Sequence, residues 1–193
     1  MPELRSTPKT PDVLSPARRR AVTIPFHWPD PPLHVVLVEP EIPPNTGNIA
    51  RLCAATGSVL HLIEPLGFKI TDRHLRRAGL DYWPSVDLRR YTSWDLWLRD
   101  AAPERRWLFT TGGARSVFDV EFQPGDALVF GCESRGLSDA QLAADPGRGV
   151  GIPIRSDAVR SLNLSGAVSI ALFEALRQIH ARSSSRDSRT PAR

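Results

Sequence analysis

The sequence contains only two cysteines, and neither lies in a motif typical of a disulfide scaffold or a metal site. Cys53 and Cys132 lie far apart in the chain, without a CxxC pair and without a nearby pair of histidines. This excludes a disulfide scaffold and a sequence-local zinc site, and it is typical of a reducing cytoplasm. No apolar run approaches the roughly 18 residues of a membrane span, and the N-terminus lacks the apolar region of a secretory signal. We therefore expect a cytoplasmic protein without a membrane segment.

Common signatures of nucleotide-binding and hydrolytic enzymes are also missing. No strand is followed by GxGxxG with an acidic residue about 20 positions later, and neither GxxxxGK[ST] nor GxSxG occurs. The five histidines are scattered. His34 and His61 fall in predicted strands, where a structural role is more common than metal ligation. The sequence therefore predicts no metal site.

The composition is that of an ordinary globular protein. The 193 residues include 41% apolar and 24% charged residues, and the length suits one domain. The formal net charge of +4 is uneven, because residues 1–32 carry +2 and residues 181–193 carry +3, which leaves −1 for residues 33–180. RNA bound by the globular part would have to be held by local clusters of cations.

The two ends of the chain differ in composition from the rest. Residues 1–32 hold eight of the 18 prolines and show no helical or alternating pattern, which predicts a disordered leader. Within it, Ile24, Phe26 and Trp28 are candidates for docking on the globular part. Residues 181–193 are rich in serine and arginine, so we expect a disordered tail. Solvated tails without a specific role are the simplest interpretation of both.

Strands and helices alternate through residues 33–180, which we expect to form the globular domain. Short continuous apolar runs predict strands buried on both faces, and apolar positions at helical spacing predict the helices. This alternation indicates an α/β fold with a mostly parallel sheet and helices on both faces. The predicted strands are residues 34–38, 59–63, 107–110, 127–130 and 150–154, and the predicted helices are 46–56, 94–101, 138–142 and 163–180.

The first motif, EPEIPPNTGNIAR, occupies residues 39–51 between a strand and a helix. Asn45 or Thr46 is expected to cap the helix, whose free N–H groups would form an anion site at the ends of the strands. Arg51 lies about 200° around the helix from the apolar Ile49, so we expect it to point away from the core. A solvated surface arginine is the common alternative, but the small polar residues beside it favour a site.

The second motif, FGCESRGL, occupies residues 130–137. A buried strand ends at Gly131, and a turn follows around Gly136. In open α/β sheets, ligands bind at the carboxyl ends of the strands, where glycines let the backbone approach them. Glu133 and Arg135 either form a local ion pair or contact a ligand.

The third motif, IPIRSDAVRSLNLS, occupies residues 152–165 and again leads from a strand through a loop to a helix. Asn163 is expected to cap the long helix. Ser161, Asn163 and Ser165 would all be plain capping residues on one interpretation and pocket residues on the other. Three loops of this kind at strand ends indicate one shared pocket.

The motifs NTGNIxR, FGxExxGL and IPxxxxxxRSLNLS, in this order, resemble motifs one to three of the SPOUT methyltransferases. The segments EPEIPPNTGNIARLCAATG and LRRAGLDYW resemble the TrmL branch in particular, and the resemblance covers residues 33–180. It implies an α/β fold with a deep C-terminal trefoil knot and a homodimer formed through the knot region. It also implies S-adenosylmethionine as methyl donor, tRNA as substrate and no metal. The implied reaction is 2′-O-methylation of the ribose at the wobble position, nucleotide 34, of the anticodon, on cytidine or a modified uridine.

The resemblance also assigns residues. Arg51 and Asn45 match the catalytic motif. Because a guanidinium with a pKa above about 12 is a poor base, we expect Arg51 to grip a phosphate and stabilise the forming alkoxide. The residues matched to the methyl donor are Phe109, Gly131, Glu133, Gly136, Ile152, Ser161 and Asn163. The residues matched to RNA are Arg73, Arg76, Arg77 and Arg135, of which the first three would otherwise be interpreted as a solvated helix face.

Two positions depart from the family pattern. Gly166 stands where an asparagine is usual, and Phe173 where a tyrosine is usual, which affects substrate affinity more than methyl transfer. A non-catalytic RNA-binding knot protein is therefore one alternative. A 2′-O-methyltransferase acting on rRNA is the other, but those relatives often carry an added N-terminal RNA-binding domain, for which 32 proline-rich residues are too few.

Overall fold

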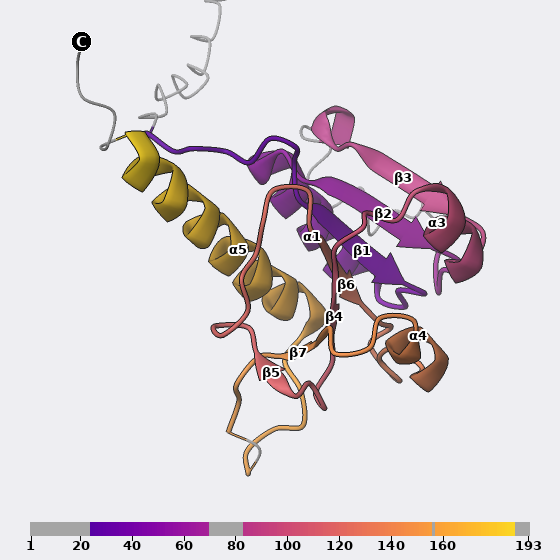
Figure 1. The fold of residues 1–193 in the computed structure, drawn as a ribbon. Helices are drawn as coiled ribbons and strands as arrows, with labels where there is room; N and C mark the ends of the chain where they lie inside the picture. The colour runs from indigo at the N-terminus through magenta and orange to yellow at the C-terminus, as the bar shows by residue number, and fades with distance from the viewer. Residues whose placement is uncertain (1–23, 70–82, 156, 188–193) are drawn as a thin grey trace, which may run out of the picture.

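A seven-stranded sheet forms the centre of the molecule (Figure 1). The computed structural model describes residues 24–69, 83–155 and 157–187. Every strand pairing is parallel, and the order across the sheet is β3-β2-β1-β6-β4-β7-β5. The strands are β1 (His34–Val38), β2 (Val59–Ile63), β3 (Leu88–Tyr91), β4 (Arg106–Phe109), β5 (Arg115–Ser116), β6 (Ala127–Phe130) and β7 (Gly149–Gly151). The helices are α1 (Pro43–Thr56), α3 (Trp94–Asp100), α4 (Asp139–Ala143) and α5 (Leu164–Asp187), with a 3₁₀ turn at Trp83–Ser85.

The parallel register places the loops of the three motifs at one edge of the sheet. His34 of β1 pairs with Val59 of β2 on one side and with Ala127 of β6 on the other. Since all the strands run in the same direction, their carboxyl ends lie together. The loops that leave β1, β6 and β7 are those that carry the three motifs, and this edge is where parallel α/β sheets bind ligands.

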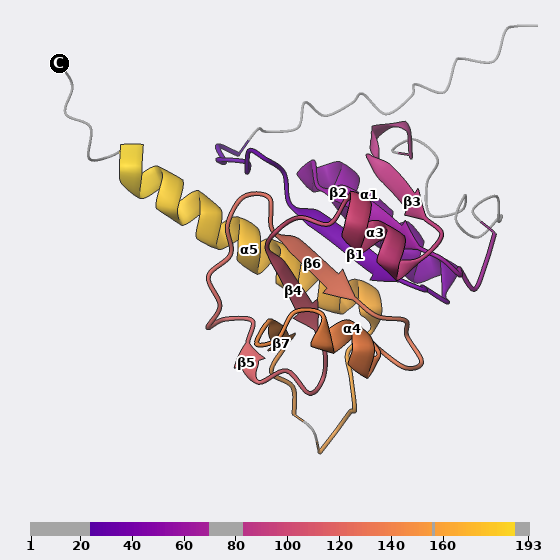
Figure 2. The same cartoon turned by 45° about the vertical axis from the view of Figure 1, so that its right-hand side comes forward.

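Helices cover both faces of the sheet, as the alternation predicted. Successive side chains of a strand point to opposite faces. On β1, Val35 and Leu37 belong to the hydrophobic cluster shared with α1 and α5, whereas Val36 and Val38 belong to the cluster shared with α3 and α4. Figure 2 shows α5 passing behind β4 and β6, with α4 on the near side. The α/β class is confirmed.

The start of α1 differs from the prediction. The helix begins at Pro43 because two prolines occupy its first positions, where a missing N–H breaks no helical hydrogen bond. Ile42 is the N-cap, and no side chain caps the helix. The expectation that Asn45 or Thr46 caps it is wrong, since both lie buried in the helix. The helix ends at residue 56, as predicted, where Gly57 with φ of 68° follows as its C-cap.

The edges of the sheet were the least predictable part of the fold. The sequences of β3 and β5 are short and rich in arginine, so they give no apolar pattern. The strand predicted at residues 150–154 is β7, which ends at Gly151. Pro153 has no N–H to donate to a neighbouring strand, which shortens the ladder. The central strands at 34–38, 59–63 and 127–130 match the prediction.

The C-terminal helix extends beyond its predicted end. Asn163 caps α5 as predicted, because its Oδ1 accepts hydrogen bonds from the backbone N–H of Ser165 at 2.9 Å and from the Ser165 hydroxyl at 2.7 Å. The helix continues past residue 180 to Asp187, into the segment that was expected to be disordered. Part of the expected leader is also ordered, with the Phe26 ring stacked on His180 at a centroid distance of 4.5 Å.

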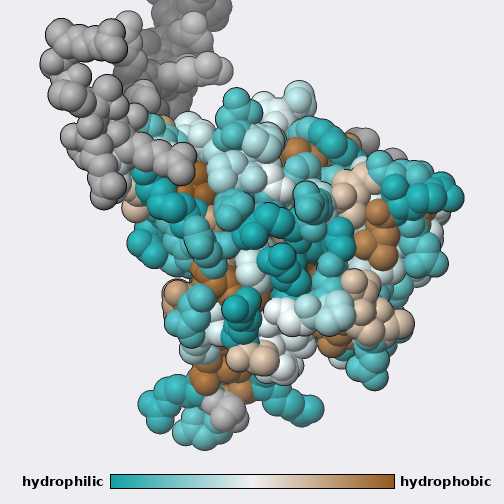
Figure 3. Space-filling view, viewed as in Figure 1, coloured by the Kyte–Doolittle hydropathy of each residue, from teal (hydrophilic) through white to brown (hydrophobic). Residues whose placement is uncertain are grey.

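The face of the molecule viewed in Figure 1 is mostly hydrophilic, with small, separate hydrophobic patches (Figure 3). Within the described ranges, no helix combines the length and the apolar character needed to cross a bilayer. Cys53 and Cys132 are both buried and free, so no disulfide contributes to the fold.

Candidate active site

A cavity of about 870 Å³ lies at the carboxyl ends of β4, β6 and β7. Its volume is within the range of roughly 300–1,000 Å³ that is common for cofactor sites. Loops of all three motifs contribute to its wall, so the prediction that they share one pocket is confirmed. The residues singled out from the sequence that line it are Asn45, Phe109, Gly131, Glu133, Arg135, Gly136, Ile152, Ser161 and Asn163.

The carboxylate of Glu133 connects the second motif to the start of α1. Oε2 accepts a hydrogen bond from the backbone N–H of Glu41 at 2.8 Å. Oε1 accepts one from the Asn45 side-chain amide at 2.9 Å and one from the backbone N–H of Ile42 at 3.3 Å. The positive end of the helix is therefore met by a carboxylate of the protein itself. The anion site expected there is taken by Glu133.

The first motif also reaches back to the second, through the side chain of Glu41. The Glu41 carboxylate accepts hydrogen bonds from the backbone N–H of Ser134 at 2.9 Å and from the Ser134 hydroxyl at 2.7 Å. Arg135 donates to the carboxylate of Glu39 at 2.7 Å, so the local pair between Glu133 and Arg135 does not form. Glu39 has a φ of 52°, a conformation that non-glycine residues rarely adopt and that clusters at functional sites.

Asn45 links the first motif to the third. Its side-chain amide donates to Glu133, and its Oδ1 accepts a hydrogen bond from Nδ2 of Asn163 at 3.0 Å. Asn163 in turn accepts from Ser165 as the cap of α5. One chain of side-chain hydrogen bonds thus runs through the three motifs. Asn163 is both a capping residue and a pocket residue, so the two interpretations of the third motif hold together.

Gly131 allows the loop of the second motif to fold tightly over the end of β6. A Cβ atom at this position would lie 2.0 Å from the carbonyl carbon of Gly136 and 2.2 Å from the backbone nitrogen of Leu137. No side chain fits there. Gly136 has a φ of 72°, which also favours glycine. The glycines therefore let the loop pack tightly on itself, and the approach of its backbone to a ligand stays a prediction.

Three exposed arginines line the cavity: Arg115, Arg135 and Arg160. Contacts with Cys132 and with Glu39 raise the pKa of Arg135. Arg115 and Arg160 were not singled out as RNA contacts, because Arg115 belongs to a strand of two residues and Arg160 stood out only as part of the third motif. The cavity therefore offers more cationic groups than the sequence suggested.

Arg51 is exposed on α1, so the prediction that it points away from the core is confirmed. It is not among the residues that line the cavity, although Asn45 of the same helix is. Arg73, Arg76 and Arg77 lie outside the described residues.

The two departures from the family pattern have different surroundings. A Cβ at Gly166 would have no atom within 4 Å, so the glycine is not required by packing. Phe173 is 55% exposed, so its missing hydroxyl would have faced solvent or a partner. Neither residue takes part in the hydrogen bonds that join the three motifs.

His34 and His61 have a structural role, as predicted. Nδ1 of His34 lies 2.9 Å from Nε2 of His61, and Nε1–H of Trp97 donates to Nδ1 of His61 at 3.3 Å. Burial lowers the pKa of His61 to about 3, with smaller effects from His34 and Arg89. Among the described residues, no three His, Cys, Asp or Glu side chains form a group that could hold a metal ion.

Known proteins resemble this chain over most of its length. It is 51% identical over 148 residues to a tRNA (cytidine(34)-2′-O)-methyltransferase from Acidovorax sp. (strain JS42), covering 75% of this chain and 91% of that protein. A solved structure that concerns the 2-OH methylation of C/U34 on tRNA is 50% identical, with a TM-score of 0.71, covering 76% of this chain and 95% of that chain.

The SpoU methyltransferase AviRb from Streptomyces viridochromogenes, solved in complex with the cofactor AdoMet, is a more distant neighbour. It has 26% identity and a TM-score of 0.65, and the alignment covers 81% of this chain and 59% of that one. The model of the SpoU rRNA Methylase family matches residues 32–173, which include all three motifs. The chain therefore belongs to the SpoU rRNA Methylase family.

Proposed function

We propose that this protein methylates the ribose 2′-oxygen of nucleotide 34 in tRNA anticodons, on cytidine or a modified uridine, with S-adenosylmethionine as methyl donor. The meeting of the three motifs at one cavity carries the proposal. Relatives that share half of its residues are tRNA (cytidine(34)-2′-O)-methyltransferases. The family match over residues 32–173 includes all three motifs, so the similarity includes the site and not only the fold.

The cavity suits S-adenosylmethionine, and AviRb supports this choice by its bound AdoMet. Phe109 and Phe130 stack at a centroid distance of 4.5 Å and give the cavity an apolar wall. The tight turn between Gly131 and Gly136 adds backbone N–H and C=O groups to the lining. Such a mixture suits a ligand with a flat base and polar substituents. When bound, S-adenosylmethionine supplies a methyl group activated by a positively charged sulfur.

Asn45 and Arg51 are the proposed catalytic residues. The Asn45 amide is fixed on both sides, by Glu133 and by Asn163, so it presents a preorganised polar group in the cavity. A guanidinium is a poor base but a good partner for an anion, which suits Arg51 to binding and not to proton removal. We assign it the grip on the phosphate next to the target ribose and the stabilisation of charge on the 2′-oxygen.

The cationic groups around the cavity are the proposed contacts for the tRNA backbone. Arg115 reaches the lining from β5, and Arg135 and Arg160 reach it from the loops after β6 and β7. A phosphate backbone that crosses the cavity would meet all three, and phosphate contacts of this kind fix the position of the RNA. Arg73, Arg76 and Arg77 remain proposed RNA contacts on the resemblance alone.

We also propose that the C-terminal half forms the trefoil knot of the SPOUT methyltransferases and that the protein acts as a homodimer through this region. On α5, Ile170 is 38% exposed and Phe173 is 55% exposed, and their spacing of three residues places them on one face of the helix. A second copy would cover this face. Light scattering tests the dimer, which Phe173→Glu should weaken.

Methyl transfer to a synthetic anticodon stem-loop tests the activity. The purified full chain, with radiolabelled S-adenosylmethionine, should label a stem-loop with cytidine at position 34. The matched control carries 2′-deoxycytidine at the same position and should remain unlabelled, because the acceptor oxygen is missing. Label on the control, or transfer to ribosomal RNA but not to tRNA, would contradict the proposal. Donor binding without transfer to any RNA would indicate the non-catalytic alternative.

A further inference from the structure

An aromatic stack joins the described N-terminal segment to the end of α5. The Phe26 and His180 rings are stacked, with centroids 4.5 Å apart and an interplanar angle of 16°. His27 lies against the same imidazole at 5.3 Å, and its backbone N–H donates to Nδ1 of His180 at 3.2 Å. Trp28 packs on Phe26 at 4.6 Å. All four residues of this stack lie outside the family match, which covers residues 32–173.

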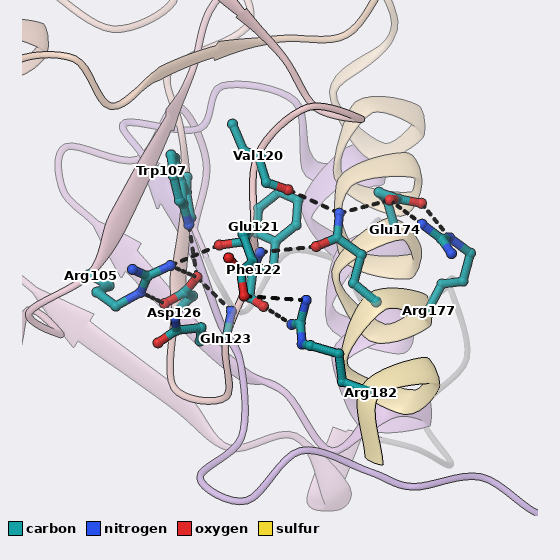
Figure 4. A network of polar contacts seen from close by, with 11 residues as sticks. Arg105, Trp107, Val120, Glu121, Phe122, Gln123, Asp126, Glu174, Arg177 and Arg182 are labelled. Carbon is teal, nitrogen blue, oxygen red and sulfur yellow. Dashed lines mark hydrogen bonds and ion pairs between the residues drawn. The ribbon is translucent and has the colours of Figure 1, made fainter. Parts of the chain in front are cut away.

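The other side of α5 is held by a separate polar network (Figure 4). The Gln178 side chain accepts a hydrogen bond from the Phe122 N–H at 3.1 Å and donates to the Val120 carbonyl at 3.0 Å. Arg182, one turn further along, donates to the Phe122 carbonyl. His180 lies midway between these two residues in sequence, so it points to the opposite side of the helix. The last turns of α5 are therefore clamped from both sides, which gives the stack a fixed base.

Trp28 is the exposed member of the stack. Phe26 packs partly against the main hydrophobic cluster, whereas the Trp28 side chain is 54% exposed. A half-exposed indole on an ordered aromatic base is the arrangement on which unpaired nucleobases stack in proteins that bind single-stranded nucleic acid. Among the described residues, Phe26 has the only aromatic ring that contacts the Trp28 ring.

The charge of the chain favours a polyanion at this end of the molecule. Figure 1 shows the described N-terminal segment beside the end of α5. The terminal segments that continue from there, residues 1–32 and 181–193, carry +2 and +3, while residues 33–180 carry −1. The net positive charge of the chain therefore belongs to its two terminal segments, and this charge favours a polyanion over a basic protein as their partner.

We propose that Trp28 stacks on an unpaired base of the bound tRNA and forms a second contact outside the methyl-transfer site. His180 lies roughly 24 Å along α5 from its first turn at the cavity, given a rise of about 1.5 Å per residue. A tRNA seated at the cavity extends well beyond that distance. The inference rests on the proposed function for the identity of the RNA, and it adds a contact contributed by the residues before the family domain.

Substitution of Trp28 in the full chain tests the contact. For Trp28→Ala, we expect the Kd and the KM for tRNA to rise roughly fivefold or more, as for loss of one stacked base. The kcat at saturating tRNA and the affinity for S-adenosylmethionine should not change. The dependence of tRNA affinity on salt should also keep its slope, because no cation is removed. Trp28→Phe should retain most of the affinity, and Ile24→Ala, which removes a 79% exposed side chain from the same segment, is the matched control.

Two results would overturn the inference. The first is a Trp28→Ala variant that binds labelled tRNA as tightly as the unsubstituted protein does. The second is a change in oligomeric state on substitution, measured by light scattering, which would assign the indole to a second copy of the chain. The direct binding measurement separates this inference from the proposed function. If the unsubstituted protein transfers no methyl group, the proposed function is contradicted, but the effect of Trp28→Ala on the Kd for tRNA can still be measured.

Discussion

Replacing Glu133 by alanine tests whether one carboxylate holds the active-site loops together. The substitution leaves three donors without their acceptor: the N–H groups of Glu41 and Ile42 and the side-chain amide of Asn45. Hydrogen bonds to charged groups contribute about 1.5–3 kcal/mol each. Water in the open cavity replaces part of the lost hydrogen-bond energy, and the bond from the Ile42 N–H, at 3.3 Å, is weak. We therefore expect the free energy of unfolding to fall by about 2–3 kcal/mol, and binding of S-adenosylmethionine to weaken because Asn45 is no longer fixed.

Urea unfolding and calorimetric titration with S-adenosylmethionine measure the two effects. Glu104→Ala removes an exposed carboxylate from another loop and should stay within about 0.5 kcal/mol of the unsubstituted protein. Glu133→Gln keeps one acceptor oxygen, so its free energy of unfolding should lie between those of Glu133→Ala and Glu104→Ala. An alanine variant with unchanged stability and unchanged donor affinity would refute the idea that Glu133 fastens α1 to the second motif.

Three further predictions follow from other parts of the structure. Arg51→Lys should keep the affinity for S-adenosylmethionine and lose most of the kcat, because lysine lacks the planar fork of the guanidinium; turnover at the original rate would remove Arg51 from the mechanism. Asp126→Ala leaves the Arg105 guanidinium without its fully buried partner. It should lower the free energy of unfolding by about 3 kcal/mol, the low end for a broken buried pair because Arg105 is 31% exposed. The control is Asp100→Ala, which breaks the exposed pair with Arg99 and should leave the unfolding temperature unchanged. Equal shifts of the unfolding temperature for Asp126→Ala and Asp100→Ala would contradict this reasoning. Burial lowers the pKa of His61 to about 3, so below about pH 6.5 the unfolded chain binds a proton that the folded protein excludes. Stability should fall as the pH drops from 6.5 toward 3, by up to about 1.4 kcal/mol per pH unit from this group, and urea midpoints of His61→Gln should show a shallower slope.

The sequence predicted the central sheet and the shared pocket because both depend on local patterns. Continuous apolar runs marked the inner strands, and each motif followed one of them. Parallel strands bring their carboxyl ends to one edge, so the meeting of the three loops followed from the topology. The edge strands escaped prediction because β5 has only two residues and β3 carries two adjacent exposed arginines, so neither shows an apolar pattern.

The partners within the site could not be predicted, because they connect positions distant in sequence. Glu133 had a cation two residues away in Arg135, which made a local pair the simple expectation. The start of α1 instead offers Glu133 two backbone N–H groups and an amide in a fixed arrangement. Arg135 reaches Glu39, at the end of β1. Only the neighbouring positions of β1 and β6 in the sheet make these choices available.

The carboxylate at the beginning of α1 has a consequence for which metabolites the cavity admits. Many adenosine compounds in a cell, ATP above all, differ from S-adenosylmethionine by carrying phosphates. A helix end left open to the cavity would attract those phosphates. With Glu133 at that end, an adenine nucleotide would have to bring its negative charges up to another negative charge. Glu133 therefore makes this end of the cavity less favourable for a phosphate than for the positively charged sulfur of the proposed methyl donor.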